Sequence, residues 1–414
     1  MVRYMQNIIT LKKILKEPFF YIICSLILLI VCCVDPFVPE INDRSDLLVV
    51  DGSIVKGRGL QYINISTSSA INQPEYIPVE HCTVIVSDSS GNEFNFFEIS
   101  KGQYVLYIED AQLDYDNKYK LILRIPGRGT YESRYQTLLK TPPVDSIYGI
   151  VENRYSDYTK KESLRGLQFY VDLKASDDAS RFYRWKIEET WEYHAEERTD
   201  GYFDGYYLHF FSRPSESVFY CWKTKDINGL YSSSTSDLIR NEKKKIPLYY
   251  IDAASNKLWV KYCATVKQYA LNEDAYNYWE QKKQEINESG GFYTTQPSQL
   301  KSNIYNINNP DEQILGYFWA SSVTKKRMFF ENPFYKEVES ACSSYGGLFI
   351  YDKNNIQGDS VYAYYFTTPD QNILLPDPPF YIYKDHGILF TTVPRKCLDC
   401  TADGGINQKP DFWE

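Results

Sequence analysis

The chain has 414 residues, enough for two or three domains, and a net charge of −9 at pH 7. Its 38 Tyr, 22 Phe and 7 Trp favour a β-rich protein with ample core material, although the same side chains could line a ligand-binding surface. An acidic chain repels phosphate backbones, so this composition argues against nucleic-acid binding.

The first 32 residues have the pattern of a secretory signal peptide. Four basic residues come first, namely Arg3, Lys12, Lys13 and Lys16. An apolar run over residues 19–31 follows, and it is shorter than the roughly 20 residues that span a bilayer. The run ends at Cys32 and Cys33, in a string that resembles a bacterial lipobox. We therefore predict cleavage before Cys33 and lipidation of its thiol.

Lipidation at Cys33 would anchor the mature chain to a membrane outside the cytoplasm. Residues 33–44 are polar and rich in proline, as in a flexible stalk. Two alternatives stay open. Cys32 could be the modified residue, or the apolar run could remain as an uncleaved anchor helix.

Residues 45–143 alternate in the manner of an Ig-like β-sandwich. A first strand at 47–50 is expected to lead into an Asp51-Gly52 turn. Alternating apolar residues then predict three strands, marked by Cys82, Val84 and Val86; by Tyr104, Leu106 and Ile108; and by Tyr119, Leu121, Leu123 and Ile125. Turn residues at 89–92 and 126–129 close two of these strands. Because Cys82 is in phase with two valines, we expect a buried free thiol there.

Pro142-Pro143 marks a predicted boundary, beyond which residues 144–414 form a larger antiparallel β-rich domain. Two of its strands are marked by Leu167, Phe169, Val171 and Leu173, and by Tyr183, Trp185, Ile187, Trp191 and Tyr193. The opposite face of the second strand carries Arg184, Lys186, Glu188 and Glu192, so we expect that face to be wet.

One amphipathic helix is predicted near residues 272–289 of this domain. Asn272 can cap its start and Gly290 can end it. Five apolar residues fall on one side at helical spacing, namely Leu271, Ala275, Tyr278, Trp279 and Ile286.

The tail contains Cys397-x-x-Cys400, for which a local disulfide between Cys397 and Cys400 is the preferred interpretation. A zinc site would need two further ligands, and a thioredoxin-like centre would need the pair to open a helix after a strand. Two free thiols are the remaining alternative. With the disulfide formed, Phe412 and Trp413 would hold the tail on the body.

The residues point to no catalytic centre, cofactor or metal site. The four histidines lack the spacing of metal ligands; they are His81, His194, His209 and His386. Neither a G-x-S-x-G elbow nor a P-loop is present. Glu188, Glu189 and Glu192 share one strand, and they are better explained as a solvated face than as the paired carboxylates of a glycosidase.

Several strings in a fixed order resemble one family, the Bacteroidota lipoproteins with domain of unknown function 4249. The strings include Val49-Val50-Asp51-Gly52, Phe182-Tyr183-Arg184-Trp185, Gln268-Tyr269-Ala270-Leu271, Leu315-Gly316-Tyr317-Phe318 and Lys409-Pro410-Asp411-Phe412-Trp413. The resemblance covers essentially the whole mature chain. It implies an outer-membrane lipoprotein, often encoded beside a TonB-dependent receptor, and it implies no activity. The N-terminal region also resembles the prealbumin-like or carboxypeptidase-regulatory sandwiches.

These features together predict a non-enzymatic lipoprotein, anchored by lipid in the outer membrane and facing the cell surface. It would serve a TonB-dependent receptor by capturing a ligand or capping the receptor. Two other functions remain open, an envelope-assembly or adhesion module and a hydrolase of glycans or peptides. The identity of the ligand does not follow from the sequence.

Overall fold

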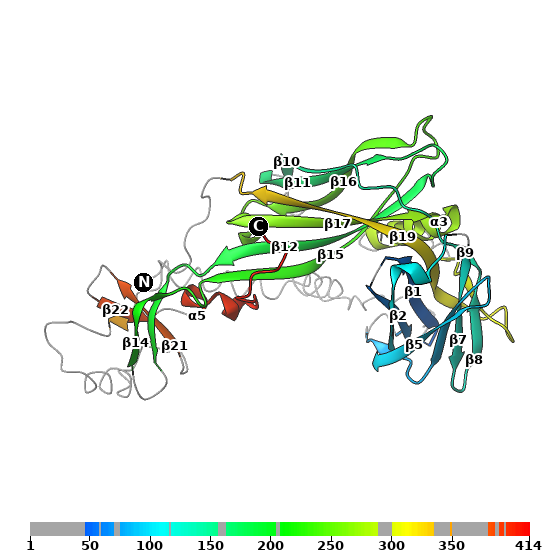
Figure 1. Ribbon diagram of the computed structural model, residues 1–414, viewed down its shortest axis with the longest axis horizontal. Coiled ribbons are helices and arrows are strands. Elements are labelled where there is room, and N and C mark those ends of the chain that lie inside the picture. The colour runs from blue at the N-terminus through cyan, green and yellow to red at the C-terminus, as the bar shows by residue number, and fades with distance from the viewer. Residues whose placement is uncertain are drawn as a thin grey trace, which may run out of the picture. The chain divides into compact units, whose positions relative to one another are not determined.

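The computed structural model describes residues 46–57, 59–69, 75–115, 117–155, 163–203, 208–288, 300–334, 348–349, 380–385, 389–392 and 395–414. They belong to one compact unit that spans Asp46–Ser69 and Glu75–Glu414. The chain is mainly β, as its sequence predicts, with antiparallel-rich sheets and one long helix among the described residues (Figure 1). The signal peptide at 1–32, the lipidation site Cys33 and the stalk at 33–44 lie outside the described residues and stay predictions.

Short strands at the start of the described chain form a β-sandwich. They are β1 (Leu48–Lys56), β2 (Gly59–Thr67), β3 (Ile77–Pro78), β4 (Thr83–Asp88), β5 (Glu93–Ser100), β6 (Gln103–Ile108), β7 (Lys118–Ile125), β8 (Gly129–Ser133) and β9 (Gln136–Thr137), with a 3-10 turn, η1 (Asp110–Gln112). The strand order is β1-β2-β6-β5-β4-β7-β8. Figure 1 draws these strands in blue and cyan.

The alternation of apolar and polar residues along these strands determines which side chains are buried, as the sequence predicts. Tyr119, Leu121, Leu123 and Ile125 on β7 are all buried. At the end of β4 the Asp88 carboxylate accepts hydrogen bonds from the backbone N–H groups of Ser90 and Asn92, at 2.9 and 2.8 Å, and so forms the predicted turn. Cys82, just before β4, is a free thiol and is half-buried.

The turn expected at Asp51-Gly52 is wrong, because both residues lie inside β1. Gly52 instead permits close packing. A Cβ at this position would lie 3.3 Å from the Ile63 side chain and 3.5 Å from that of Phe318. A glycine within a strand therefore marks a tight approach of neighbouring side chains here rather than a change of chain direction.

The larger part of the chain packs two sheets around an aromatic core. One sheet contains β10 (Ser146–Tyr155), β11 (Ser163–Lys174) and β16 (Glu242–Asp252). The other places β12 (Phe182–His194) between β15 (Tyr220–Ser234) and β17 (Lys261–Leu271), with β19 (Ile314–Glu331) beyond β17. Phe169 of β11 stacks on Tyr249 of β16, with ring centroids 4.4 Å apart. A short 3-10 turn, η2 (Asn256–Leu258), precedes β17.

Strand β19 connects this region to the sandwich. Its first half pairs in parallel with β1, from Leu48 opposite Ile314 to Lys56 opposite Ser322. Its second half pairs antiparallel with β17. A short strand, β18 (Ile304–Asn306), adds to the edge of β8. Ile314 and Phe318 consequently enter the core of the sandwich, although they are distant from it in sequence.

The predicted amphipathic helix is α3 (Glu273–Glu288). Asn272 caps it, since its side-chain oxygen accepts a hydrogen bond of 2.8 Å from the Ala275 N–H. Tyr278 and Trp279 are buried, as expected, but Ile286 is exposed. Gly290, its predicted end, lies outside the described residues. Among the described residues, none of the helices combines the length and the apolar composition that a membrane span requires.

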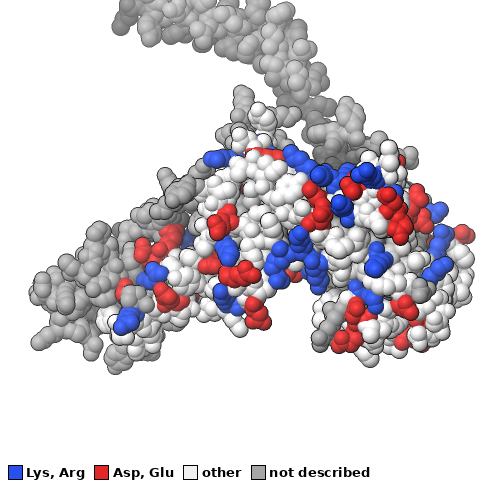
Figure 2. All heavy atoms as spheres, turned by 45° about the horizontal axis from the view of Figure 1, so that its top comes forward, with Lys and Arg blue, Asp and Glu red and all other residues white. Residues whose placement is uncertain are grey.

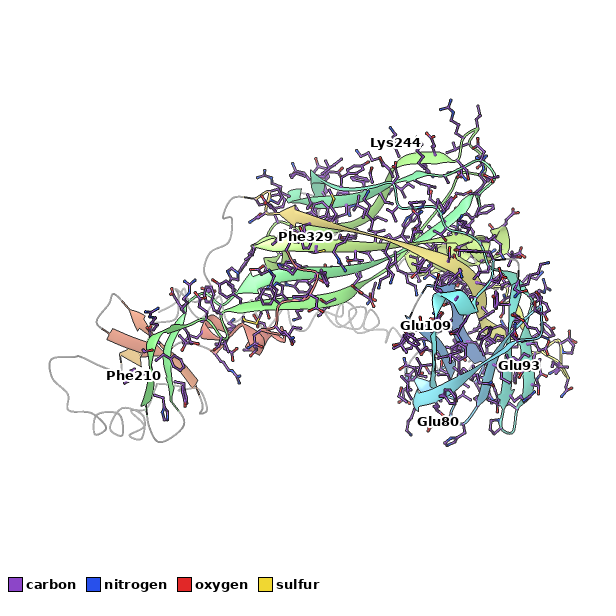
Figure 3. All side chains as sticks on the ribbon, in the orientation of Figure 1. Glu80, Glu93, Glu109, Phe210, Lys244 and Phe329 are labelled. Atoms are coloured by element: carbon purple, nitrogen blue, oxygen red, sulfur yellow. A yellow bond between two sulfur atoms is a disulfide. The ribbon has the colours of Figure 1, made fainter. Side chains whose placement is uncertain are left out.

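The remaining described strands form a smaller sheet, and short helices lead into the tail. They are β13 (Thr199–Phe203), β14 (Leu208–Ser215), β20 (Leu348–Phe349), β21 (Phe380–Asp385), β22 (Leu389–Thr392), α5 (Arg395–Leu398) and η3 (Cys400–Asp403). Phe210 lies on β14 of this sheet, and Phe329 lies on β19 (Figure 3).

The disulfide predicted between Cys397 and Cys400 is wrong. Cys400 is bonded to Cys221 of β15, 179 residues away in sequence, and Cys397 takes part in a disulfide of its own. Backbone hydrogen bonds between Trp222 and Ile406 align the tail with β15, which brings Cys400 to Cys221. A pattern local to the tail carries no information on this long-range register.

Trp413 holds the end of the tail, as expected. It is buried against Phe329, with ring centroids 5.2 Å apart, and its Nε1–H donates a hydrogen bond of 2.8 Å to the Glu192 carboxylate.

Candidate functional site

A pocket of about 940 Å³ opens beside the sheet formed by β15, β12, β17 and β19. We call it the basic pocket, because five basic side chains and two acidic ones line it among the described residues: Arg184, Lys186, Lys267, Lys283 and Lys325, against Asp51 and Asp226. Aromatic and apolar side chains from the sheet and from β2 complete the lining; they include Leu60, Tyr62, Tyr269 and Trp319. This volume suits a small ligand.

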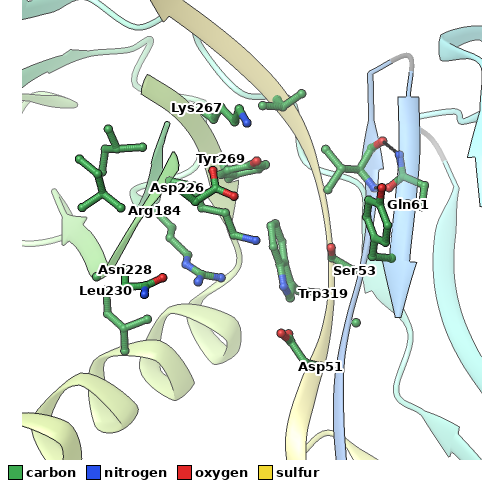
Figure 4. A pocket seen from close by; sticks show the side chains of 18 of the residues that line it. Asp51, Ser53, Gln61, Arg184, Asp226, Asn228, Leu230, Lys267, Tyr269 and Trp319 are labelled. Carbon is green, nitrogen blue, oxygen red and sulfur yellow. Dashed lines mark hydrogen bonds between the residues drawn. The ribbon is translucent and has the colours of Figure 1, made fainter. Parts of the chain in front are cut away.

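The walls of the basic pocket come from distant parts of the sequence (Figure 4). The β1–β19 pairing places Asp51 and Ser53 along one side. Gln61 of β2 is held firmly, because its side-chain amide exchanges hydrogen bonds of 2.9 and 3.1 Å with the backbone of Val55. Asp226 and Asn228 of β15 lie on the other side.

Strand register gathers the basic residues on one face of the sheet. On β12 the buried aromatics Tyr183 and Trp185 face the core, so Arg184 and Lys186 face the pocket. Lys186 lies opposite Lys267 of β17, which lies opposite Lys325 of β19. Three lysines therefore form a row across neighbouring strands, an arrangement in which like charges repel.

Arg184 departs from the expected wet face, since only 7 % of it is exposed. Helix α3 covers it. The guanidinium lies 3.5 Å from the ring centroid of Trp279 and 5.7 Å from that of Trp319. Sequence alternation predicts which face Arg184 takes, but it cannot reveal that a helix packs over that face.

The Arg184 guanidinium stacks on tryptophan but forms no ion pair with the described residues. Its buried Nε–H finds no hydrogen-bond acceptor there. Burial lowers the pKa of Arg184 to about 10, and the carboxylate of Asp51 offsets part of that effect without forming an ion pair. The side chain therefore keeps its charge at neutral pH, in a place where an unpaired charge is unfavourable.

The lysines of the row differ in how well they are neutralised. Lys267 donates to the Glu188 carboxylate at 2.9 Å. Within the described structure, Lys186 and Lys325 have no such partner and both are exposed. Although the Lys186 side chain reaches solvent, partial burial of its amine lowers its pKa, and the nearby charge of Arg184 lowers it further.

The end of α3 contributes Lys283 and Ile286 to the rim of the pocket. This explains why Ile286 is exposed although it follows the apolar spacing of the helix. The helix is attached to the sheet through Trp279 and through a hydrogen bond from the Ser232 hydroxyl to Glu280.

The three described histidines have separate surroundings and form no metal-ligating cluster. His81 is exposed, His194 bonds to Glu192 at 2.8 Å, and His209 stacks on Tyr202 with ring centroids 4.6 Å apart. His386 lies outside the described residues. No cluster of three or more metal-ligating side chains occurs in the described part of the chain.

The carboxylates of β12 have separate partners. Glu188 pairs with Lys267, and Glu192 pairs with His194 and Trp413. Glu189 is buried on the opposite face, where it accepts hydrogen bonds from Lys257 at 2.5 Å and from the Tyr262 hydroxyl at 3.0 Å.

The sequence profile described as domain of unknown function (DUF4249) matches residues 34–327. The chain belongs to this family. The matched segment contains all of the described residues that line the basic pocket, from Asp51 to Lys325. It ends before the Cys397–Trp413 tail, so the match is shorter than the resemblance suggested. No curated protein matches the chain.

Proposed function

We propose that this DUF4249 chain is a lipid-anchored outer-membrane protein that captures a small ligand in the basic pocket and serves a TonB-dependent receptor, without catalysing a reaction. The observation that carries ligand capture is the pocket itself, which a sheet, a helix and the sandwich build together. The lipobox-like string at Cys33 supports the anchor, and the family resemblance supports the receptor.

The anchor is tested with radiolabelled palmitate on the full chain. We expect label on the unaltered chain and on Cys32→Ala, and none on Cys33→Ala. If label persists in Cys33→Ala but disappears in Cys32→Ala, Cys32 is the lipidated residue. Absence of label in every case would contradict the anchor.

The receptor is tested by purifying the lipidated chain from its own membrane in mild detergent. A barrel-type receptor that co-purifies in constant ratio supports the proposal. A chain recovered alone under these conditions, with its lipid attached, contradicts the accessory role.

A second candidate is an adhesion or envelope-assembly module. It is favoured by exposed apolar side chains on neighbouring strands of the sandwich, namely Leu60, Tyr62, Phe97 and Tyr107. Leu60 lies opposite Tyr107, and the half-buried Val105 lies opposite both Tyr62 and Phe97. Such a strip is typical of a protein contact. Replacing Phe97 by Ser tests it. If this variant no longer co-purifies with its partner but still binds ligand, the apolar strip is the surface that contacts the partner.

A further inference from the structure

We propose that the ligand of the basic pocket carries an oxyanion, a carboxylate, sulfate or phosphate group, which binds at Arg184 with Lys186 and Lys325 beside it. The inference rests on the proposed ligand capture and names the chemistry of that ligand. Three independent features of the pocket support it.

The first feature is the state of Arg184. Burying a guanidinium is unfavourable unless hydrogen bonds and opposite charge compensate it. At this position the described residues supply neither an ion pair nor an acceptor for the Nε–H. Buried donors are nearly always satisfied, so an unsatisfied charged donor that borders a pocket is suited to binding a ligand.

The second feature is the way in which Arg184 is held. Trp279 covers one face of the guanidinium at 3.5 Å, and Trp319 lies 5.7 Å away. Stacking fixes the plane of the group without using its N–H donors. Figure 4 shows the side chain extending between Asn228 and Leu230 on one side and Trp319 on the other. A fork of donors fixed in this way suits an oxyanion, which can accept two hydrogen bonds at once.

The third feature is the lysine row. Lys186 and Lys325 flank Lys267 on adjacent strands, and only Lys267 has a carboxylate partner among the described residues. An anion placed near Arg184 would reduce the repulsion within the row. Asp51 and Asp226 also line the pocket, so the anion must avoid them, and this limits where it can lie.

The charge of the whole chain strengthens the argument. The protein carries −9 overall, and exposed acidic residues such as Glu93 and Glu109 lie on the sandwich (Figure 3). Lys and Arg side chains nevertheless gather beside a hollow in the face shown in Figure 2. A concave site of opposite sign to its surroundings concentrates ligands of the matching charge.

The aromatic lining adds a second requirement for the ligand. Trp319, Tyr269 and Tyr62 border the same space as Arg184. Rings of this kind bind flat or apolar groups. The ligand that fits is therefore a small molecule, or one end of a chain, in which an oxyanion is attached to a ring or an apolar group.

The test uses four probes that share one ring, namely benzoate, phenyl sulfate, phenyl phosphate and the neutral benzamide. Binding to the full chain in detergent is measured by calorimetry and by tryptophan fluorescence. We expect at least one anion to bind about tenfold or more tightly than benzamide, and its identity assigns the oxyanion.

Arg184→Gln should weaken binding of the preferred anion roughly tenfold or more, whereas Arg240→Gln, an exposed residue outside the pocket, should leave it unchanged. If Arg184→Gln fails to fold, Lys186→Gln and Lys325→Gln decide. Both side chains are exposed, and each substitution should weaken anion binding several-fold and reduce its dependence on salt.

Equal binding of all four probes would overturn the oxyanion inference and leave ligand capture intact. The oxyanion inference would also be overturned if none of the three substitutions changed the affinity for the anion. Failure of the receptor to co-purify would contradict the proposed function alone, because the probe measurements do not depend on the receptor.

Discussion

Gly316 offers a direct test of the strand pairing that builds the basic pocket. It lies opposite Val50 in the parallel β1–β19 pair and has a φ of +107°. A Cβ at this position would lie 1.8 Å from the Val50 carbonyl oxygen. The substitution Gly316→Ala therefore combines a backbone conformation that L-residues avoid with a collision against the backbone of the neighbouring strand.

We expect Gly316→Ala to reduce the free energy of unfolding by about 2–6 kcal/mol. About 1–3 kcal/mol comes from the positive φ, and about 1–3 kcal/mol from forcing a methyl group into filled space. Gly127→Ala is the matched control, since Gly127 has a φ of +75° and open space around its Cβ position. It should lose only about 1–2 kcal/mol.

Urea unfolding followed by tryptophan fluorescence measures both variants. Trp319 lies on β19, three residues beyond the substitution, so its signal reports on this junction directly. If the two alanine variants were equally stable, β19 could not run beside β1 in this register. The wall that carries Asp51 would then be placed wrongly.

Three further outcomes follow from buried groups. Cys221→Ser should lower stability by about 2–5 kcal/mol and release the tail to proteolysis, while Cys82→Ser, at a free thiol, should change little. Glu189→Gln should cost about 1–3 kcal/mol in urea unfolding, because the Glu189 carboxylate is buried, whereas Glu188→Gln should cost under about 1 kcal/mol at its half-exposed ion pair. Burial raises the pKa of the Tyr269 hydroxyl from 10.0 to about 12. The stabilisation from keeping this hydroxyl neutral is therefore complete below about pH 10 and is lost as the pH rises towards 12. Urea unfolding midpoints measured across that pH range would show the loss.

Local patterns in the sequence were sufficient to predict much of the fold. The alternation of Tyr119 to Ile125 and of Tyr183 to Trp185 selects buried faces without reference to any distant residue. Asn272 and the apolar spacing after it likewise predict α3 from residues within a few turns. These predictions succeeded because period and capping are properties of neighbouring residues.

The parts that failed depend on contacts between distant residues. Asp51-Gly52 has the composition of a turn, but its conformation is decided by Ile63 and by Phe318, far away in the chain. The pairing of Cys400 with Cys221 depends on how the tail lies along β15. The basic pocket does not follow from local patterns for the same reason, because its described lining comes from six strands and a helix. The charges at alternate positions of β12 are a signal within the sequence, but by themselves they favour a solvated surface.

The residue at position 184 is not required by the fold. Tyr183 and Trp185 fill the aromatic core on one face of β12, and an apolar side chain between them would pack under α3 and avoid the penalty of burying a charge. Burying a guanidinium there carries a desolvation penalty, yet the surroundings hold it against Trp279 and leave its Nε–H unsatisfied. Residues that are unfavourable for stability are expected at functional sites. The unfavourable burial of Arg184 is therefore the strongest reason to place ligand recognition in the basic pocket, and Arg184→Leu should yield a more stable chain that prefers the bound anion over benzamide roughly tenfold less than the unaltered chain does.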